Sequence, residues 1–326
     1  MGYGARALEQ LRGFYSGEFH SLSESDNPDV DDTAAESLSR LTDAELENTS
    51  LQTDQIQVRD PRKMPPLLLQ LSEKRAPRLH YLGVSYGVTA SLYKFWKRSG
   101  FVPVYLRQTP NELTGEHTCV MLHALPVDEQ AQSVVVDPTW LSAFAEDFHR
   151  RFLHLLSYQF RQFTSVTALG IMEAARNVKQ IASSENEPHR LDTPIRYRPD
   201  LYRILSPFDL KRLESFSNSL LDYHVVMDLF PLLADLYFNG RLLDFSSHSR
   251  DAKGQRRSAG PLTLSSIQSG LFLAIGLQHK SVDEIEAELN LPNSQILGML
   301  VKISKKIYAS FKYIMNEEVD DETVAV

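Results

Sequence analysis

YLGVSYGVTASLYKFWKRSGFVPVYLRQTPNELTGEHTCVMLHAL, residues 81–125, is the stretch that decides the first part of the fold. It opens with an apolar run closed by Gly87, which is typical of a buried strand. Thr89 can then cap a helix whose last turn is basic and whose end is marked by Gly100. Two further strands are expected at 101–108 and 117–125, on either side of a polar turn. The order strand, helix, strand, strand indicates an α/β unit.

The segment before this unit contains a short helix and an acidic insert. Apolar residues at helical spacing predict a helix over 5–16, directly after the glycine-bearing start MGYG. Two glycines before a helix leave backbone N–H groups open to a phosphate, although an ordinary turn is the alternative. Residues 19–58 are rich in Ser, Asp, Glu and Thr and poor in aromatics, which predicts a solvated, disordered insert.

The second half of the chain changes to long amphipathic stretches, which predict helices. Three of them are expected within 262–312, where Ser281 and Glu284 form a capping box. That outline resembles a helix-turn-helix or winged-helix core. The acidic residues from 316 to 326 are expected to form a disordered tail.

The fold class is therefore predicted as α/β followed by all-α. We expect two domains, 1–138 and 139–315, with the tail after them.

Charge is distributed unevenly along the 326 residues. Of the net charge of −8, −9 falls on residues 17–62 and −5 on residues 316–326, so the remaining residues carry +6. Phosphate contacts need clustered Lys and Arg, and an acidic chain would argue against them. Because the acidity is confined to the insert and the tail, the parts expected to fold are mildly basic and can accept RNA.

Other sequence signals exclude several classes of site. No apolar run reaches the roughly 20 residues that span a bilayer, so a soluble, intracellular chain without membrane contact is expected. The single cysteine, Cys119, lies in an apolar strand and is predicted to be inert core. His149 and His154 are five residues apart, unlike the i,i+4 pair of a helical zinc site, so no metal site is predicted.

Several of these stretches closely resemble one family, the RNA cytidine acetyltransferases. The likeness rests on MGYGARAL, PPLLLQLSEKRAPRLHYLGVSYGVT, LYKFWKRSGFVPVYLRQTPNELTGEHTCVML, SPFDLKRLESFSNSLLDYH and GLQHKSVDEIE. It weakens in the acidic insert, around residues 177–200 and around residues 245–260. The resemblance implies the closing part of a GNAT-type acetyltransferase fold over 1–138 and a tRNA-binding helical region over 139–315.

The resemblance also implies a site for acetyl-CoA. The family motif reads QGMGYGSRA, so the matching residues here are Met1, Gly2, Tyr3, Gly4 and Ala5, with Ala5 in place of a serine. Arg98, in FWKRSGF, falls on an arginine that contacts acetyl-CoA in the family, and a guanidinium suits a phosphate of the cofactor. From the residues alone, a solvated cation at a helix end is the alternative for Arg98.

The chain is expected to begin inside this motif. The family's ATP-using module and the first GNAT strands then lie before residue 1, and the strand before the loop normally binds pantetheine and the thioester oxygen. A fragment of this kind is expected to bind acetyl-CoA poorly. Because the ATP-using module is not part of this chain, ATP use is expected only of the full-length family enzyme.

The catalytic acid and base are not fixed by the sequence. Trp96 stands where many GNAT enzymes have a tyrosine, and an indole N–H is no useful acid. The substitutes nearby are Tyr93, Tyr105 and His117, each with the alternative of a core or structural residue.

A basic surface is expected on the helical half. Its candidate RNA-binding residues are Arg150, Arg151, Arg161, Arg198, Lys211 and Arg212. The alternative is that these residues form ordinary solvated helix faces.

The family likeness implies acetylation of the exocyclic N4 amine of cytidine in small-subunit rRNA and in tRNA, and a nucleolar location in the nucleus. Its expected partners include an RNA-adaptor protein or snoRNA, and a second copy in a homodimer of the full enzyme. Two other functions stay open. One is a catalytically inactive RNA-binding or interaction fragment, and the other is a protein lysine acetyltransferase.

Overall fold

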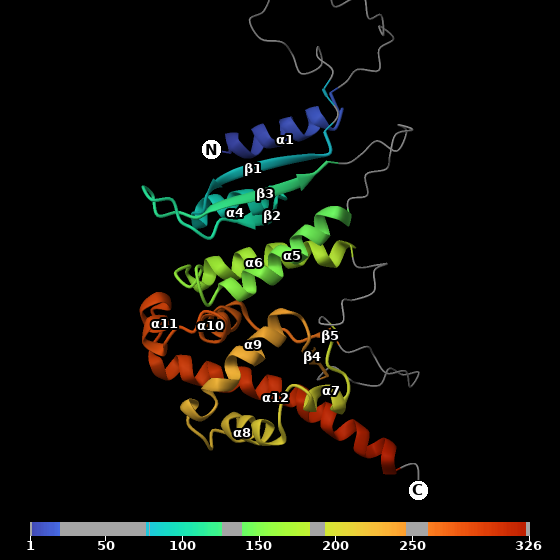
Figure 1. Ribbon diagram of the computed structural model, residues 1–326, viewed down its shortest axis with the longest axis vertical. Coiled ribbons are helices and arrows are strands. Elements are labelled where there is room, and N and C mark those ends of the chain that lie inside the picture. Colours follow the sequence, from blue (N-terminus) through green and yellow to red (C-terminus); the bar gives the residue numbers. More distant parts are fainter. Residues whose placement is uncertain are drawn as a thin grey trace, which may run out of the picture. The chain divides into compact units, whose positions relative to one another are not determined.

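The computed structural model describes residues 2–19, 76–77, 79–125, 139–182, 193–245 and 260–323 (Figure 1). The acidic insert predicted at 19–58 lies outside these ranges apart from Phe19. The chain divides into two compact units, residues 1–81 with 125–135 and residues 82–124 with 136–326. Each unit is described by itself.

The first unit contains helix α1 (Tyr3–Tyr15), which confirms the helix predicted over 5–16. The helix ends at Ser16, and Gly17 follows with a φ of 81°. Gly13 is the buried position of α1, because the ring of Phe19 folds back against it. A side chain at position 13 would meet that ring, so the close turn requires glycine here.

The second unit opens with the predicted order of strands and helix. Strands β1 (Tyr81–Gly87), β2 (Val102–Leu106) and β3 (Thr118–Ala124) form a sheet in the order β1-β3-β2. Helix α4 (Ala90–Arg98) connects β1 to β2. The hydroxyl of Thr89 accepts a hydrogen bond from the N–H of Leu92, and Gly100 follows the helix with a φ of 79°. Both predicted end signals of this helix are therefore confirmed.

A β-bulge interrupts the pairing of β2 with β3. These strands are antiparallel, with Pro103 opposite Met121 and Tyr105 opposite Val120, so one extra residue, Val104, lies between the two pairs. Pro103 and Leu106 are buried, whereas Tyr105 is 46% exposed. Strict alternation would bury residues 103 and 105 on one face. The bulge turns Tyr105 outward instead.

Two long helices cover this sheet. Helices α5 (Thr139–Leu155) and α6 (Ser165–Ala182) pack against each other and against β2, and α6 also contacts α4. Their shared core contains the buried rings of Phe148, Phe152 and Phe160. The rings of Phe152 and Phe160 lie 5.5 Å apart. The sheet and these two helices consequently form one hydrophobic core.

Several of the remaining helices pack against α10. In chain order the elements are α7 (Arg198–Tyr202), α8 (Pro207–Ser217), the 3-10 turns η1 (Tyr223–Val225) and η2 (Met227–Leu229), α9 (Phe230–Phe238), β4 (Leu243–Asp244), β5 (Gly260–Pro261), α10 (Ser266–Gly276), α11 (Val282–Leu289) and α12 (Asn293–Thr323). Phe272 on α10 packs on Phe230 and Phe238 of α9. Residues 269–276 are all buried, which explains why this helix carries no polar face.

The last three helices match the sequence prediction, except at the end of the chain. The hydroxyl of Ser281 accepts from the N–H of Glu284, and the Glu284 carboxylate accepts from the N–H of Ser281, so the capping box is confirmed. Asn290 then ends α11 in the left-handed conformation. Helix α12 continues to Thr323, into the residues from 316 for which the sequence predicts a disordered tail. Adding residues to a formed helix costs little, so the acidic end extends α12.

Within the described residues, no helix combines the length and the apolar character needed to cross a bilayer.

Candidate functional site

The predicted phosphate loop forms the N-terminal end of α1. Gly2 lies just before the helix with a φ of 140°, a conformation that favours glycine. The N–H of Arg6 donates to the Gly2 carbonyl, while no side chain caps the helix. The first-turn amides therefore have no intrahelical acceptor, and the helix dipole makes this end attractive to an anion. Tyr3 is 89% exposed, so the end of the helix is open to solvent in its own unit. Met1 lies outside the described residues.

Arg98 lies in the last turn of α4 and is exposed. Its neighbour Lys97 is fixed to α6, with its Nζ donating to the Gly170 carbonyl at 3.2 Å and lying 3.5 Å from a carboxylate oxygen of Glu173. Among the described residues, Arg98 has no such partner. Its guanidinium is therefore available to a phosphate, as the resemblance implies. The loop at α1 belongs to the first unit and Arg98 to the second.

Tyr93 is buried between α4 and α6, with 4% of its surface exposed. Its hydroxyl donates to the Gly170 carbonyl at 3.4 Å. Burial, reinforced by nearby Cys119, raises the pKa of Tyr93 far above its usual range. The phenol thus stays protonated and packed in the core, which matches the structural alternative for this residue.

Cys119 and Tyr86 belong to the same buried cluster. Burial raises the pKa of the Cys119 thiol to about 12, so the predicted inert character of this residue has a physical cause. The Tyr86 hydroxyl donates to Sδ of Met121 at 3.0 Å, and its ring lies 6.0 Å from that of Trp96. Burial raises the pKa of Tyr86 as well.

His117 is held in place by three neighbours. Its Nδ1 donates to the Arg107 carbonyl at 2.8 Å, and its ring packs edge-on against Phe160 at 5.4 Å and beside Phe163 at 5.2 Å. Only 9% of the residue is exposed. These contacts are those of a residue that joins β3 to the α5–α6 connection, and they leave little of the ring for a substrate.

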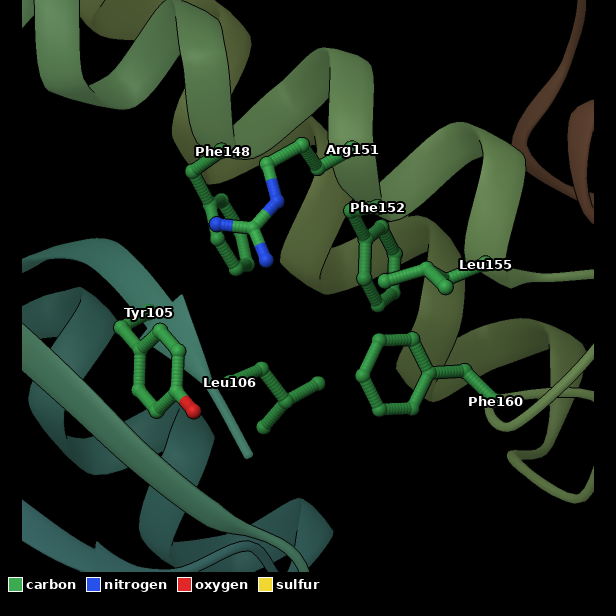
Figure 2. Close-up of a pocket in the computed structure, with 7 residues that line it drawn as sticks. All are labelled: Tyr105, Leu106, Phe148, Arg151, Phe152, Leu155 and Phe160. Atoms are coloured by element: carbon green, nitrogen blue, oxygen red, sulfur yellow. The ribbon is translucent and has the colours of Figure 1, made fainter. Parts of the chain in front are cut away.

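Tyr105 lies at the rim of a small hollow between β2 and α5 (Figure 2). The other rim residue is Arg151, an exposed side chain of α5. Figure 2 shows the guanidinium of Arg151 on the helix side of the hollow, in front of the Phe148 ring. The floor of the hollow is apolar and is formed by Leu106, Phe148, Phe152, Leu155 and Phe160.

The six predicted RNA-binding residues separate into two groups. Arg161 donates to both carboxylate oxygens of Glu284, at 2.9 and 2.8 Å, and Arg212 pairs with Asp209 at 2.6 Å and with Asp228 at 2.9 Å. These two guanidinium groups connect elements of the fold. Arg198 lies 5.1 Å from the centre of the Tyr202 ring. The side chains with no ion pair among the described residues are Arg150, Arg151, Arg198 and Lys211.

The sequence did not reveal a partly buried polar network at the start of α6. Glu288 of α11 accepts hydrogen bonds from the N–H and the hydroxyl of Ser165, at 2.5 and 2.6 Å. Lys280 completes the network, since its Nζ lies 2.5 Å from the Glu288 carboxylate and 2.9 Å from the Phe163 carbonyl. Ser165 and Glu288 are 123 positions apart, so no local signal points to their pairing.

Within the described ranges, no three His, Cys, Asp or Glu side chains gather in a way that could hold a metal ion.

Comparison with known proteins divides the chain between the candidate cofactor-binding residues and the candidate RNA-binding residues. Residues 1–126 match the family described as GNAT acetyltransferase 2. Residues 140–326 match the family described as Possible tRNA binding domain. The glycine loop, α4 and the sheet fall in the first match, and the unpaired arginines of α5 and α7 fall in the second. The two matches place the chain in the class of GNAT acetyltransferases that carry a possible tRNA-binding domain.

Curated relatives narrow this class. RNA cytidine acetyltransferase of Schizosaccharomyces pombe is 46% identical over 99% of this chain and 28% of its own length. The Saccharomyces cerevisiae protein of that name is 45% identical over 98% of this chain and 27% of its own length, and the Homo sapiens protein is 42% identical over 100% and 28%. The chain belongs to the RNA cytidine acetyltransferase family. It spans little more than a quarter of the length of the relatives it matches.

Proposed function

We propose that this chain binds acetyl-CoA and RNA within an enzyme that transfers an acetyl group to the exocyclic N4 amine of cytidine. The observation that carries the proposal is the uncapped N-terminal end of α1, which begins with Gly2 at a φ of 140°. A helix end of this kind supplies several N–H donors and a favourable dipole to a phosphate. Arg98, without an ion pair among the described side chains, supplies the matching cation.

These residues fit the pyrophosphate and ribose phosphate end of acetyl-CoA. Bound there, acetyl-CoA supplies an acetyl group activated as a thioester. Met1 to Ala5 and Arg98 would hold the phosphates of acetyl-CoA. Their contribution to the reaction would be to position its thioester. In the transfer, a C–N bond forms to N4, the C–S bond breaks, N4 loses a proton to a base and the released thiolate takes one up. Tyr105 has an accessible phenol, whereas Tyr93 and His117 are buried.

The RNA substrates belong to the same proposal. The names of the relatives and the tRNA-binding match support an RNA substrate. We propose rRNA and tRNA as that substrate, and Arg150, Arg151, Arg198 and Lys211 as the side chains that contact it. Arg161 and Arg212, with carboxylate partners, would act by holding the fold instead. ATP use, an adaptor protein or snoRNA, dimerisation and a nucleolar location are proposals carried by the family resemblance.

The predicted helix-turn-helix remains part of this proposal as well. Helices α11 and α12 are separated by the short turn at 290–292, which supports a helix-turn-helix geometry. Helix α11 carries Asp283, Glu284 and Glu286, so it would repel a phosphate backbone. Within the helix-turn-helix, we therefore assign any RNA contact to the exposed Lys302 and Lys305 of α12.

Calorimetric titration of acetyl-CoA into the chain tests the cofactor site. Arg98→Ala should weaken binding at least about tenfold, because a charge-assisted hydrogen bond contributes roughly 1.5–3 kcal/mol. Lys94→Ala removes an exposed charge from the same helix and is the control. Equal affinity of the two variants would overturn the cofactor assignment.

The reaction itself is tested by offering RNA and a lysine-rich peptide together with labelled acetyl-CoA. Mass analysis of the nucleosides should find N4-acetylcytidine and no acetylated peptide. Acetyl-lysine alone would favour the protein acetyltransferase. RNA binding without any transfer would favour an inactive RNA-binding chain.

A further inference from the structure

Tyr105 owes its exposure to the bulge in β2. Val104 is the extra residue between the pairs Pro103–Met121 and Tyr105–Val120, and it changes which face of the sheet the following side chain meets. As a result a large aromatic ring stands 46% exposed in the strand, between the partly buried Val104 and the buried Leu106. Bulges that redirect one side chain are common beside functional sites. No hydrogen bond holds the Tyr105 hydroxyl within the described part of the chain.

Arg151 stands on the opposite side of the same hollow. It is exposed on α5, and it has no carboxylate partner among the described residues. The nearest rings beneath it are buried, with Phe148 at 6% exposed and Phe152 at 1%. Because this floor is tightly packed, the backbones of Tyr105 and Arg151 are held in fixed positions relative to each other. Figure 2 shows Tyr105 on the strand side and Arg151 on the helix side of the hollow.

The chemistry of the rim fits an unpaired stretch of RNA. An exposed aromatic ring offers a face on which a base of any identity can stack. A nearby unpaired guanidinium can bind the phosphate next to that base. Stacking needs a base that is not already paired, so a duplex would not use the ring. The hollow also joins the two matched regions, since Tyr105 lies within 1–126 and Arg151 within 140–326.

We propose that Tyr105 and Arg151 form a single-strand RNA contact, in which one unpaired base stacks on the Tyr105 ring and Arg151 binds an adjacent phosphate. This proposal rests on the proposed function, because it takes RNA as the ligand. It assigns Tyr105 to holding the RNA and not to proton transfer. It also brings RNA to the acetyltransferase sheet itself, at the edge strand β2.

Fluorescence anisotropy with a labelled short oligouridylate and with a labelled duplex RNA of equal length tests the contact. Tyr105→Ala should weaken oligouridylate binding at least about fivefold, because stacking contributes roughly 1–3 kcal/mol per base, and should leave duplex binding unchanged. Tyr105→Phe keeps the ring and should bind like the unaltered chain. Phe208→Ala removes a ring that is 79% exposed on α8 and is the aromatic control.

The salt dependence separates the role of Arg151 from that of Tyr105. Arg151→Ala should lower the slope of log affinity against log salt by about 0.7, the value for one phosphate contact to a single strand. Tyr105→Ala should leave the slope unchanged. Lys312→Ala, which removes an exposed charge from α12, is the charge control.

The outcomes distinguish this contact from the broader function. If the unaltered chain binds neither RNA, the RNA part of the proposed function fails with it. If the chain binds oligouridylate but Tyr105→Ala and Phe208→Ala behave alike, the contact is wrong and the proposed function stands. A polyglutamate peptide that displaces the oligouridylate equally well at matched charge would also overturn it, because the site would then recognise negative charge alone.

Discussion

Replacing Lys280 by methionine should destabilise the protein by about 2 kcal/mol. The change removes the cation from the Glu288 carboxylate and the hydrogen bond to the Phe163 carbonyl, while keeping a side chain of similar length. Loss of one partner from a fully buried ion pair costs roughly 3–5 kcal/mol. The side chain of Lys280 is 8% exposed and that of Glu288 is 16% exposed, and Ser165 still donates to Glu288, so the cost here should be lower.

The loss should depend on pH in a defined direction. Burial acts to raise the pKa of Glu288, but hydrogen bonds from Lys280 and Ser165 outweigh it and hold the pKa below its ordinary value. A carboxylate with a lowered folded pKa stabilises the fold above its unfolded pKa, about 4.3, and this contribution is lost as the pH falls through the folded pKa. The difference between the unaltered chain and Lys280→Met should therefore be largest near neutral pH and smaller in acid.

Urea unfolding at neutral and acidic pH measures this effect, with Lys312→Met as an exposed control. A double-mutant cycle with Glu288→Gln isolates the pair and should give a coupling of about 1 kcal/mol or more. A coupling below about 0.5 kcal/mol, or a loss no greater than that of the control, would refute the reasoning.

Three other perturbations follow from the structure. Arg212→Ala should lower the free energy of unfolding by roughly 1 kcal/mol in urea unfolding, because its guanidinium pairs with Asp228. The affinity for oligouridylate should be unchanged, and a selective loss of RNA binding would contradict this. Gly276→Ala should destabilise by about 1–3 kcal/mol in thermal unfolding, because an added Cβ would clash with the Cβ of Ala234 and the carbonyl of Phe230. An unchanged melting temperature would exclude such a close approach. Cys119 should resist iodoacetamide at pH 8 in the folded chain and react after unfolding, since burial raises its pKa to about 12; rapid labelling of folded protein, followed by mass spectrometry, would show the thiol to be accessible.

Elements with strong local signals were predicted closely from the sequence. Helix α4 begins after its Thr89 cap and ends before Gly100, because caps and left-handed glycines are properties of a few adjacent residues. The strands around it have short apolar runs bounded by turns. The capping box at Ser281 likewise needs no distant partner.

The site could be predicted only in part, because its remaining features depend on distant residues. The sequence predicts Arg161 as an RNA contact, but in the fold its guanidinium pairs with Glu284, 123 positions away. The burial of Tyr93 depends in the same way on α6. The bulge at Val104 depends on how β2 registers with β3, and no residue in VPVYL marks it.

The shared core of the sheet with α5 and α6 bears on how this architecture can be divided or recombined. A cut between residues 126 and 140 follows the boundary of the two family matches but separates β2 from the helices that cover it. The helical half alone would expose Phe152 and Phe160, which are each 1% exposed in the intact chain. Large apolar patches of that kind promote aggregation. Grafting residues 140–326 onto another protein would therefore require the recipient to supply a matching strand surface.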